Sequence, residues 1–122
     1  MIRARHMLLM VLCAAVGAAS AGELRPGGHV ADFTLKDQTG AAHQLYALAG
    51  KKAVVIMTQS DGCPIVRLAV PALREIRQRY RSQDIEFLLL NPTLQDTPDA
   101  VQRETEEFGF GMTVLLDRTQ QV

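Results

Sequence analysis

Cysteine is scarce in this chain of 122 residues, where it occurs only as Cys13 and Cys63. His29 and His43 show no ligand spacing that would bring them together with Cys63, so the sequence predicts no metal site. No cofactor-binding motif is present either, and we expect no cofactor.

Neither sign of charge is in excess, since the chain has 13 basic and 13 acidic residues. The chain therefore has no overall field that would recruit nucleic acid. No internal repeat, low-complexity tract or linker divides it, and its length predicts one domain.

No apolar run approaches the roughly 20 residues that a membrane-spanning helix needs. The longest apolar stretch, Met7 to Val16, is instead the right length for the central region of a signal peptide. Basic residues precede it, and the small residues Ala19-Ser20-Ala21 follow it. We expect residues 1–21 to be a cleaved signal peptide and residues 22–122 to be a periplasmic or secreted domain without membrane contact. Lipid attachment to Cys13 is the alternative, but the bulky Leu12 before it argues against this.

Cleavage after Ala21 would leave Cys63 as the only cysteine of the exported chain. The mature chain would carry 11 basic and 13 acidic residues, because Arg3 and Arg5 leave with the peptide. Disulfides persist in exported compartments, so a single free cysteine there indicates either a reactive thiol or pairing with another molecule.

Cys63 lies between a predicted strand and a predicted helix. The continuous apolar run Ala53–Thr58 is typical of a strand that is covered on both faces. After Pro64, a good first residue for a helix, apolar residues recur at helical spacing. The predicted stripe consists of Ile65, Leu68, Ala69, Ala72, Leu73, Ile76 and Tyr80. The free amides and the dipole of a helix start favour the thiolate form of Cys63. The alternative is an inert cysteine that acts as a small apolar residue.

The rest of the chain predicts an α/β fold with a parallel βαβ unit. A hairpin is expected from residues 32–35 and 43–46 around a turn, followed after the Cys63 helix by a buried strand at 85–90. Thr97-Pro98-Asp99 signals a helix that stops at Gly109, with Glu104, Glu106 and Glu107 mostly outward. Residues 113–116 form a last apolar segment. Functional residues in such sheets usually lie at the carboxyl ends of the strands, where Cys63 is expected.

Arginines on the predicted helix fall into two groups. Arg74, Arg77 and Arg81 lie away from the apolar stripe and are expected to be solvated. Arg67 lies one helical turn beyond Cys63, where it could steady a thiolate or an anionic substrate group. The alternative is an ordinary surface arginine.

These features resemble the thioredoxin superfamily, specifically its redoxin branch of peroxiredoxin-like and AhpC-TSA type thiol-disulfide proteins. The resemblance rests on Val30–Leu35 before a glycine-containing turn, Gly50-Lys51-Lys52 before the apolar strand, Cys63-Pro64, and Pro71 eight residues after the cysteine. It implies a thioredoxin-like fold over about residues 27–117.

The chain departs from this family at three places. Val66 stands where the thioredoxin motif has its resolving cysteine. Ser60 can replace the threonine of the peroxiredoxin motif, but Ile56 replaces its proline. The family's cis-proline loop, last two strands and closing helix would follow Asp117, so the domain is expected to be incomplete at its C-terminus.

The resemblance implies a monothiol oxidoreductase in which Cys63 attacks a peroxide or a protein disulfide. Its partner would be an external thiol or protein reductant, because Val66 stands where an internal resolving cysteine would be. Ser60 would offer a hydroxyl group at the turn, and Arg67 a cation. The alternative is a redox-inactive thioredoxin-like binding module or a fragment of a larger exported electron-transfer protein.

Overall fold

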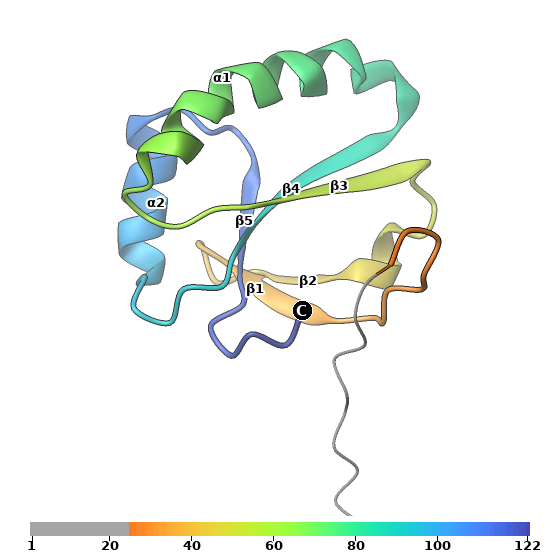
Figure 1. Ribbon diagram of the computed structural model, residues 1–122, viewed down its shortest axis with the longest axis horizontal. Helices are drawn as coiled ribbons and strands as arrows, with labels where there is room; N and C mark the ends of the chain where they lie inside the picture. Colours follow the sequence, from red (N-terminus) through yellow and green to blue (C-terminus); the bar gives the residue numbers. More distant parts are fainter. Residues whose placement is uncertain (1–24) are drawn as a thin grey trace, which may run out of the picture.

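A curled sheet of five strands with two α-helices makes up the computed structural model, which describes residues 25–122 (Figure 1). The predicted signal peptide, residues 1–21, lies outside the described residues. In chain order the elements are β1 (Thr34–Asp37), β2 (Ala42–Gln44), the 3₁₀ helix η1 (Leu45–Leu48), β3 (Ala53–Thr58), α1 (Pro64–Arg79), the 3₁₀ turn η2 (Arg81–Gln83), β4 (Ile85–Asn91), α2 (Pro98–Glu107) and β5 (Thr113–Leu116).

The strands lie in the order β2-β1-β5-β4-β3. β3 pairs in parallel with β4, and β4 in parallel with β5, whereas β1 pairs antiparallel with both β2 and β5. The helices α1 and α2 are the connections between the parallel strands. The predicted βαβ unit and N-terminal hairpin are therefore confirmed.

Alternate residues of the strands fill two cores, one on each face of the sheet. On β4, Phe87 and Leu89 pack against Val70 of α1 and Val101 of α2. Their neighbours Leu88 and Leu90 point to the other face, where the partly buried side chains include Leu48 of η1. Because both helices contribute to one core, they cover the same face of the sheet.

The prediction that β3 is covered on both faces is wrong. β3 is the edge strand of the sheet within residues 25–122, and Val55 and Ile56 are each 38% exposed. A continuous apolar run is typical of strands with a layer packed against each face, but the run does not show how completely those layers cover the strand.

The predicted apolar stripe of α1 is only partly correct. Val66, Val70 and Leu73 face the core, whereas Ile65 is 75% exposed and Leu68 is 82% exposed. α1 carries apolar residues on two sides, and periodicity alone could not show which side the sheet covers.

Element boundaries follow local signals closely in the second half of the chain. Thr97 is the N-cap of α2, its hydroxyl oxygen accepting from the Ala100 N–H at 3.2 Å, and Pro98 begins the helix. In the first half, residues 45–46 do not extend the hairpin strand as predicted. They begin η1 because the chain turns away from the sheet after Gln44.

Candidate functional site

Cys63 lies at the junction between the sheet and α1, as the sequence predicts. It is the N-cap of α1, with an extended backbone (φ −71°, ψ 112°). Its N–H donates to the Ser60 carbonyl oxygen at 3.2 Å, which closes the turn after β3. Cys63 is half-buried and is a free thiol.

Two carboxylates accept hydrogen bonds from the backbone N–H groups of the two residues that precede Cys63. The Asp61 N–H donates to Oδ2 of Asp96 at 2.7 Å, and the Gly62 N–H donates to Oε1 of Glu104 at 2.8 Å. These hydrogen bonds join the turn to the β4–α2 loop and to α2. The conformation of the turn therefore depends on residues some 35 to 42 positions away in the chain.

The remaining donors near Cys63 belong to the first turn of α1. Pro64 has no N–H, so the first free amides are those of Ile65 and Val66, which have no acceptor inside the helix. These amides and the positive end of the helix dipole are the groups available to stabilise negative charge at this end of α1.

Ser60 takes part in a polar network at the carboxyl ends of β3 and β4. Its hydroxyl group donates to Oδ2 of Asp96 at 3.3 Å and accepts from the Thr93 hydroxyl at 3.1 Å. Asp96 Oδ2 also accepts from the side-chain amide of the fully buried Asn91 at 2.8 Å. Ser60 thus holds the turn, and its proton is already engaged by Asp96.

Arg67 lies on α1 and points toward α2. Its Nε donates to Oε1 of Glu104 at 2.8 Å, and its guanidinium carbon lies 4.1 Å from the centroid of the Phe108 ring. The ion pair and the cation–π contact fix the guanidinium group near the start of α1.

Glu104 was predicted to point outward, and this prediction is wrong, since Glu104 is only 4% exposed. Arg67 and the Gly62 N–H compensate for the burial of its charge. The signal was present in the sequence: Glu104 follows the core residue Val101 by three positions and precedes Phe108 by four, so the three share a side of α2.

Gln59 is a second polar side chain that the sequence reasoning missed. It directly follows β3 and is only 3% exposed, yet both polar atoms of its side chain lack a hydrogen-bond partner among the described residues, as does Oε2 of Glu104. By strand alternation, Gln59 points to the same face as Met57, which is the face that both helices cover. Buried polar atoms without partners are rare in folded proteins.

Comparison with known proteins identifies the family. Residues 26–122 match the AhpC/TSA family. The chain belongs to the AhpC/TSA family. No curated protein matches this AhpC/TSA chain.

Solved structures share the fold of this AhpC/TSA chain. A hypothetical protein from Sinorhizobium meliloti 1021 is 28% identical, with a TM-score of 0.65 over 75% of this chain and 53% of that chain. The thioredoxin domain of a thiol-disulfide oxidoreductase from Bacteroides vulgatus is 18% identical, with a TM-score of 0.65 over 77% and 65%. A secreted Mycobacterium tuberculosis disulfide oxidoreductase, described as homologous to E. coli DsbE, is 21% identical, with a TM-score of 0.61 over 73% and 63%.

These matches confirm the thioredoxin-like fold and the redoxin branch that the sequence motifs suggested. The AhpC/TSA chain spans between about half and two thirds of the length of these structures.

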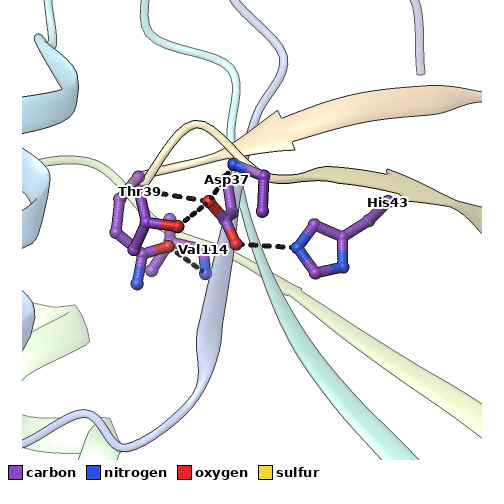
Figure 2. A network of polar contacts seen from close by, with 6 residues as sticks. Asp37, Thr39, His43 and Val114 are labelled. Carbon is purple, nitrogen blue, oxygen red and sulfur yellow. Dashed lines mark hydrogen bonds and ion pairs between the residues drawn. The ribbon is translucent and has the colours of Figure 1, made fainter.

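A separate polar cluster lies in the hairpin of the AhpC/TSA chain. Figure 2 shows the Asp37 carboxylate accepting from Thr39 and from His43, whose Nε2 lies 2.7 Å from Oδ2 of Asp37. Burial raises the pKa of Asp37, but the hydrogen bonds from Thr39, His43 and Ala41 outweigh it and hold the pKa below its ordinary value. The network stabilises the turn between β1 and β2, and His43 is a structural partner of Asp37 in it.

Other features of the AhpC/TSA chain lie apart from the thiol. Within residues 25–122, no group of three metal-ligating side chains converges, and no helix is long and apolar enough to cross a membrane. A hollow of about 1020 Å³ lies along the second half of α1, where Arg74, Arg77 and Gly111 line it. None of its lining residues precedes Pro71, so it is not part of the Cys63 site.

Proposed function

We propose that this chain is an exported monothiol oxidoreductase of the redoxin type, with Cys63 as its nucleophile. The observation that carries the proposal is the position of Cys63, a free thiol at the N-cap position of α1, just beyond the carboxyl end of β3. The backbone N–H groups in the first turn of α1 are donors that can hold an anionic group beside Cys63, and the thiolate is the nucleophilic form of cysteine. The names of two structural neighbours, a disulfide oxidoreductase and a thiol-disulfide oxidoreductase, support this chemistry.

Two substrates suit a single thiolate. With a disulfide, the Cys63 sulfur attacks one sulfur atom, the S–S bond breaks, and the other sulfur leaves as a thiolate while a mixed disulfide forms. With a peroxide, the sulfur attacks one oxygen atom, the O–O bond breaks, and the leaving oxygen takes up a proton. Sulfur is oxidised by two electrons to a sulfenic acid, which an external thiol condenses to a mixed disulfide with release of water. A second external thiol then restores Cys63.

Arg67 and Ser60 have different roles in this proposal. The half-buried guanidinium group of Arg67 offers its outer N–H groups to an anionic substrate group, because Glu104 occupies only Nε. Ser60 acts through Asp96 and the turn, as a positioning residue.

Trapping of the oxidised sulfur tests the proposal. The reduced chain is treated with hydrogen peroxide and dimedone, or with glutathione disulfide, and analysed by mass spectrometry. We expect one dimedone adduct or one glutathione mixed disulfide on Cys63, formed faster than on free cysteine. The Cys63→Ser variant, which lacks the thiol, is the negative control. Reaction no faster than that of free cysteine would contradict the enzymatic proposal.

The alternative is a redox-inactive thioredoxin-like module that binds a partner protein. Val66 favours it, because the position where the thioredoxin motif has its resolving cysteine carries no thiol. A partner captured equally well by the Cys63→Ser variant supports this alternative, whereas capture that depends on the thiol supports the oxidoreductase.

Export is also part of the proposal, and it rests on the signal-peptide pattern of residues 1–21 together with the secreted neighbour. Expression in a bacterial host followed by fractionation tests it. We expect a periplasmic or secreted protein whose N-terminal residue is Gly22. A cytoplasmic protein that retains residues 1–21 would contradict export.

A further inference from the structure

A row of arginine side chains lies along the second half of α1. Arg74, Arg77 and Arg81 follow one another at spacings of three and four residues, so they share a side of the helix. Arg79 adds a fourth arginine within residues 74–81, and all four are exposed. Because the chain as a whole has no excess of either charge, this local concentration of cations is a separate feature of the surface.

These arginines line the hollow of about 1020 Å³ along α1, which we name the arginine groove. Its surface comes from α1, the start of β4 and the loop before β5, and its defining residues are Arg74, Arg77, Arg79, Arg81, Ile85 and Gly111. Glu75 and Glu86 also line it. By strand alternation, however, the side chain of Glu86 points to the face opposite Phe87, away from α1. Cations therefore outnumber carboxylates in the groove.

The guanidinium groups in the groove are held to different degrees. Arg77 donates from Nη1 to the Gly111 carbonyl oxygen at 2.5 Å, which fixes its side chain against the loop before β5. Within residues 25–122, the guanidinium groups of Arg74, Arg79 and Arg81 have neither a hydrogen-bond nor an ion-pair partner. A guanidinium group has five N–H donors in a planar fork that matches a carboxylate. The groove therefore offers one fixed cation and three unpaired ones.

The groove lies at the end of the sheet opposite Cys63. Ile85 begins β4 and Gly111 precedes β5, whereas Cys63 lies beyond the carboxyl end of β3, which is parallel to β4. None of the lining residues belongs to β3. Figure 1 shows the C-terminus on the opposite side of the molecule from α1. The walls of the groove are thus consecutive elements of the described chain, and they are separate from the proposed thiol chemistry.

We propose that the arginine groove binds an acidic segment of a partner protein in an extended conformation. Arg77 and Arg81 are one helical turn apart, about 6 Å along α1. Alternate side chains of an extended segment are about 6.8 Å apart. Carboxylates at every second residue of such a segment can therefore pair with successive arginines, each pair joined by two parallel N–H···O hydrogen bonds.

The surroundings of the groove favour a short acidic segment over a long polyanion. A second hollow of about 400 Å³ adjoins the groove, since Arg77 and Gly111 line both. Its lining includes the carboxylates of Asp37 and Glu106 and no cation other than Arg77. A nucleic acid or a polyphosphate that continued into this second hollow would place phosphates beside carboxylates. A polypeptide can place uncharged or basic residues there instead.

Titration of the full reduced chain with a labelled peptide tests the proposal. The probe is a fluorescent peptide of about ten residues in which glutamate and serine alternate. We expect a Kd on the order of 100 µM by anisotropy at low salt, because exposed ion pairs are individually weak. Arg74→Gln/Arg81→Gln removes two unpaired cations and should weaken binding at least about fivefold. Lys36→Gln/Arg103→Gln removes the same charge outside both hollows and should leave the affinity unchanged.

Amide chemical shifts in NMR spectra locate the bound peptide. We expect changes at Arg81, Ile85 and Gly111 and none at Cys63, so the result does not depend on whether Cys63 is reactive. A matched peptide of alternating glutamine and serine should not bind. Failure of the acidic peptide to bind, equal weakening by the two double variants, or shifts centred on Cys63 would each overturn the proposal. So would tighter binding of a polyphosphate of the same charge.

Discussion

Asp37 and Glu104 are two of the three carboxylates buried in residues 25–122, and each accepts from at least one backbone N–H group. Asp37 accepts from the amides of Thr39 and Ala41, and Glu104 accepts from the amide of Gly62. Each also has a cationic or titratable partner, His43 for Asp37 and Arg67 for Glu104. Removal of one member of such a group leaves the others unpaired, so it costs more than the net value of the contact.

The lowered pKa of Asp37 predicts that its contribution to the free energy of unfolding depends on pH. Its pKa is lowered in the folded chain, so its stabilising contribution is fully present above the unfolded value of about 3.9 and is lost as pH falls through the folded value. Asp37→Asn should lower the free energy of unfolding by about 1–2 kcal/mol at pH 7 and by much less at pH 2. Urea denaturation at both pH values measures this. An equal loss at the two pH values would contradict the assignment.

The Arg67–Glu104 pair gives a prediction about coupling. Arg67→Ala leaves the buried Glu104 without its cation and should lower the free energy of unfolding by about 2 kcal/mol. The double variant Arg67→Ala/Glu104→Gln should recover part of that loss, because the buried charge is also gone. A double-mutant cycle by urea denaturation measures the coupling. Strictly additive effects would show that the two side chains do not interact.

Periodicity predicted the order of the elements better than it predicted which surfaces they bury. The strand at residues 85–91, the helix cap at Thr97 and the strand at residues 113–116 follow local signals and are found where expected. The covered side of α1 could not be predicted, because apolar residues occupy two of its sides. The order of the strands, in which β3 is an edge within residues 25–122, arises from contacts between distant residues.

The orientation of α1 can be tested by a matched pair of substitutions. Val70 is fully buried and Leu68 is 82% exposed, although the sequence pattern favoured Leu68 as the core residue. Val70→Ala should lower the free energy of unfolding by about 2 kcal/mol, and Leu68→Ala by no more than about 0.5 kcal/mol. Thermal and urea denaturation of the two variants measure the difference. A larger loss for Leu68→Ala would mean that α1 is rotated.

The sequence predicted the cysteine of the candidate site but not the side chains that support its turn. Cys63 was found from the sequence because strand, cysteine and proline follow one another. Its supporting groups, Asp96 and Glu104, lie 33 and 41 positions further along the chain and approach it only through the parallel β3–β4–β5 arrangement. Nothing local in the sequence indicates these contacts, although the spacing of Glu104 from Val101 indicated its burial.

At the scale of the whole molecule, the parallel strands and α1 bring a free thiol to the carboxyl edge of a thioredoxin-like sheet. The fold is responsible for the expected reactivity, since the first-turn amides exist only when α1 is formed. The same thiol in an unfolded chain should behave as an ordinary cysteine.

The rate at which Cys63 reacts with a small disulfide tests this account most directly. The reduced chain is mixed with 5,5′-dithiobis(2-nitrobenzoate) at pH 7, and thiolate release is followed by absorbance in the folded chain, in the urea-unfolded chain and in free cysteine. Cys63→Ser gives the background. We predict that folded Cys63 reacts at least tenfold faster than either reference. A folded rate equal to or below that of the unfolded chain would contradict the claim that this fold activates Cys63.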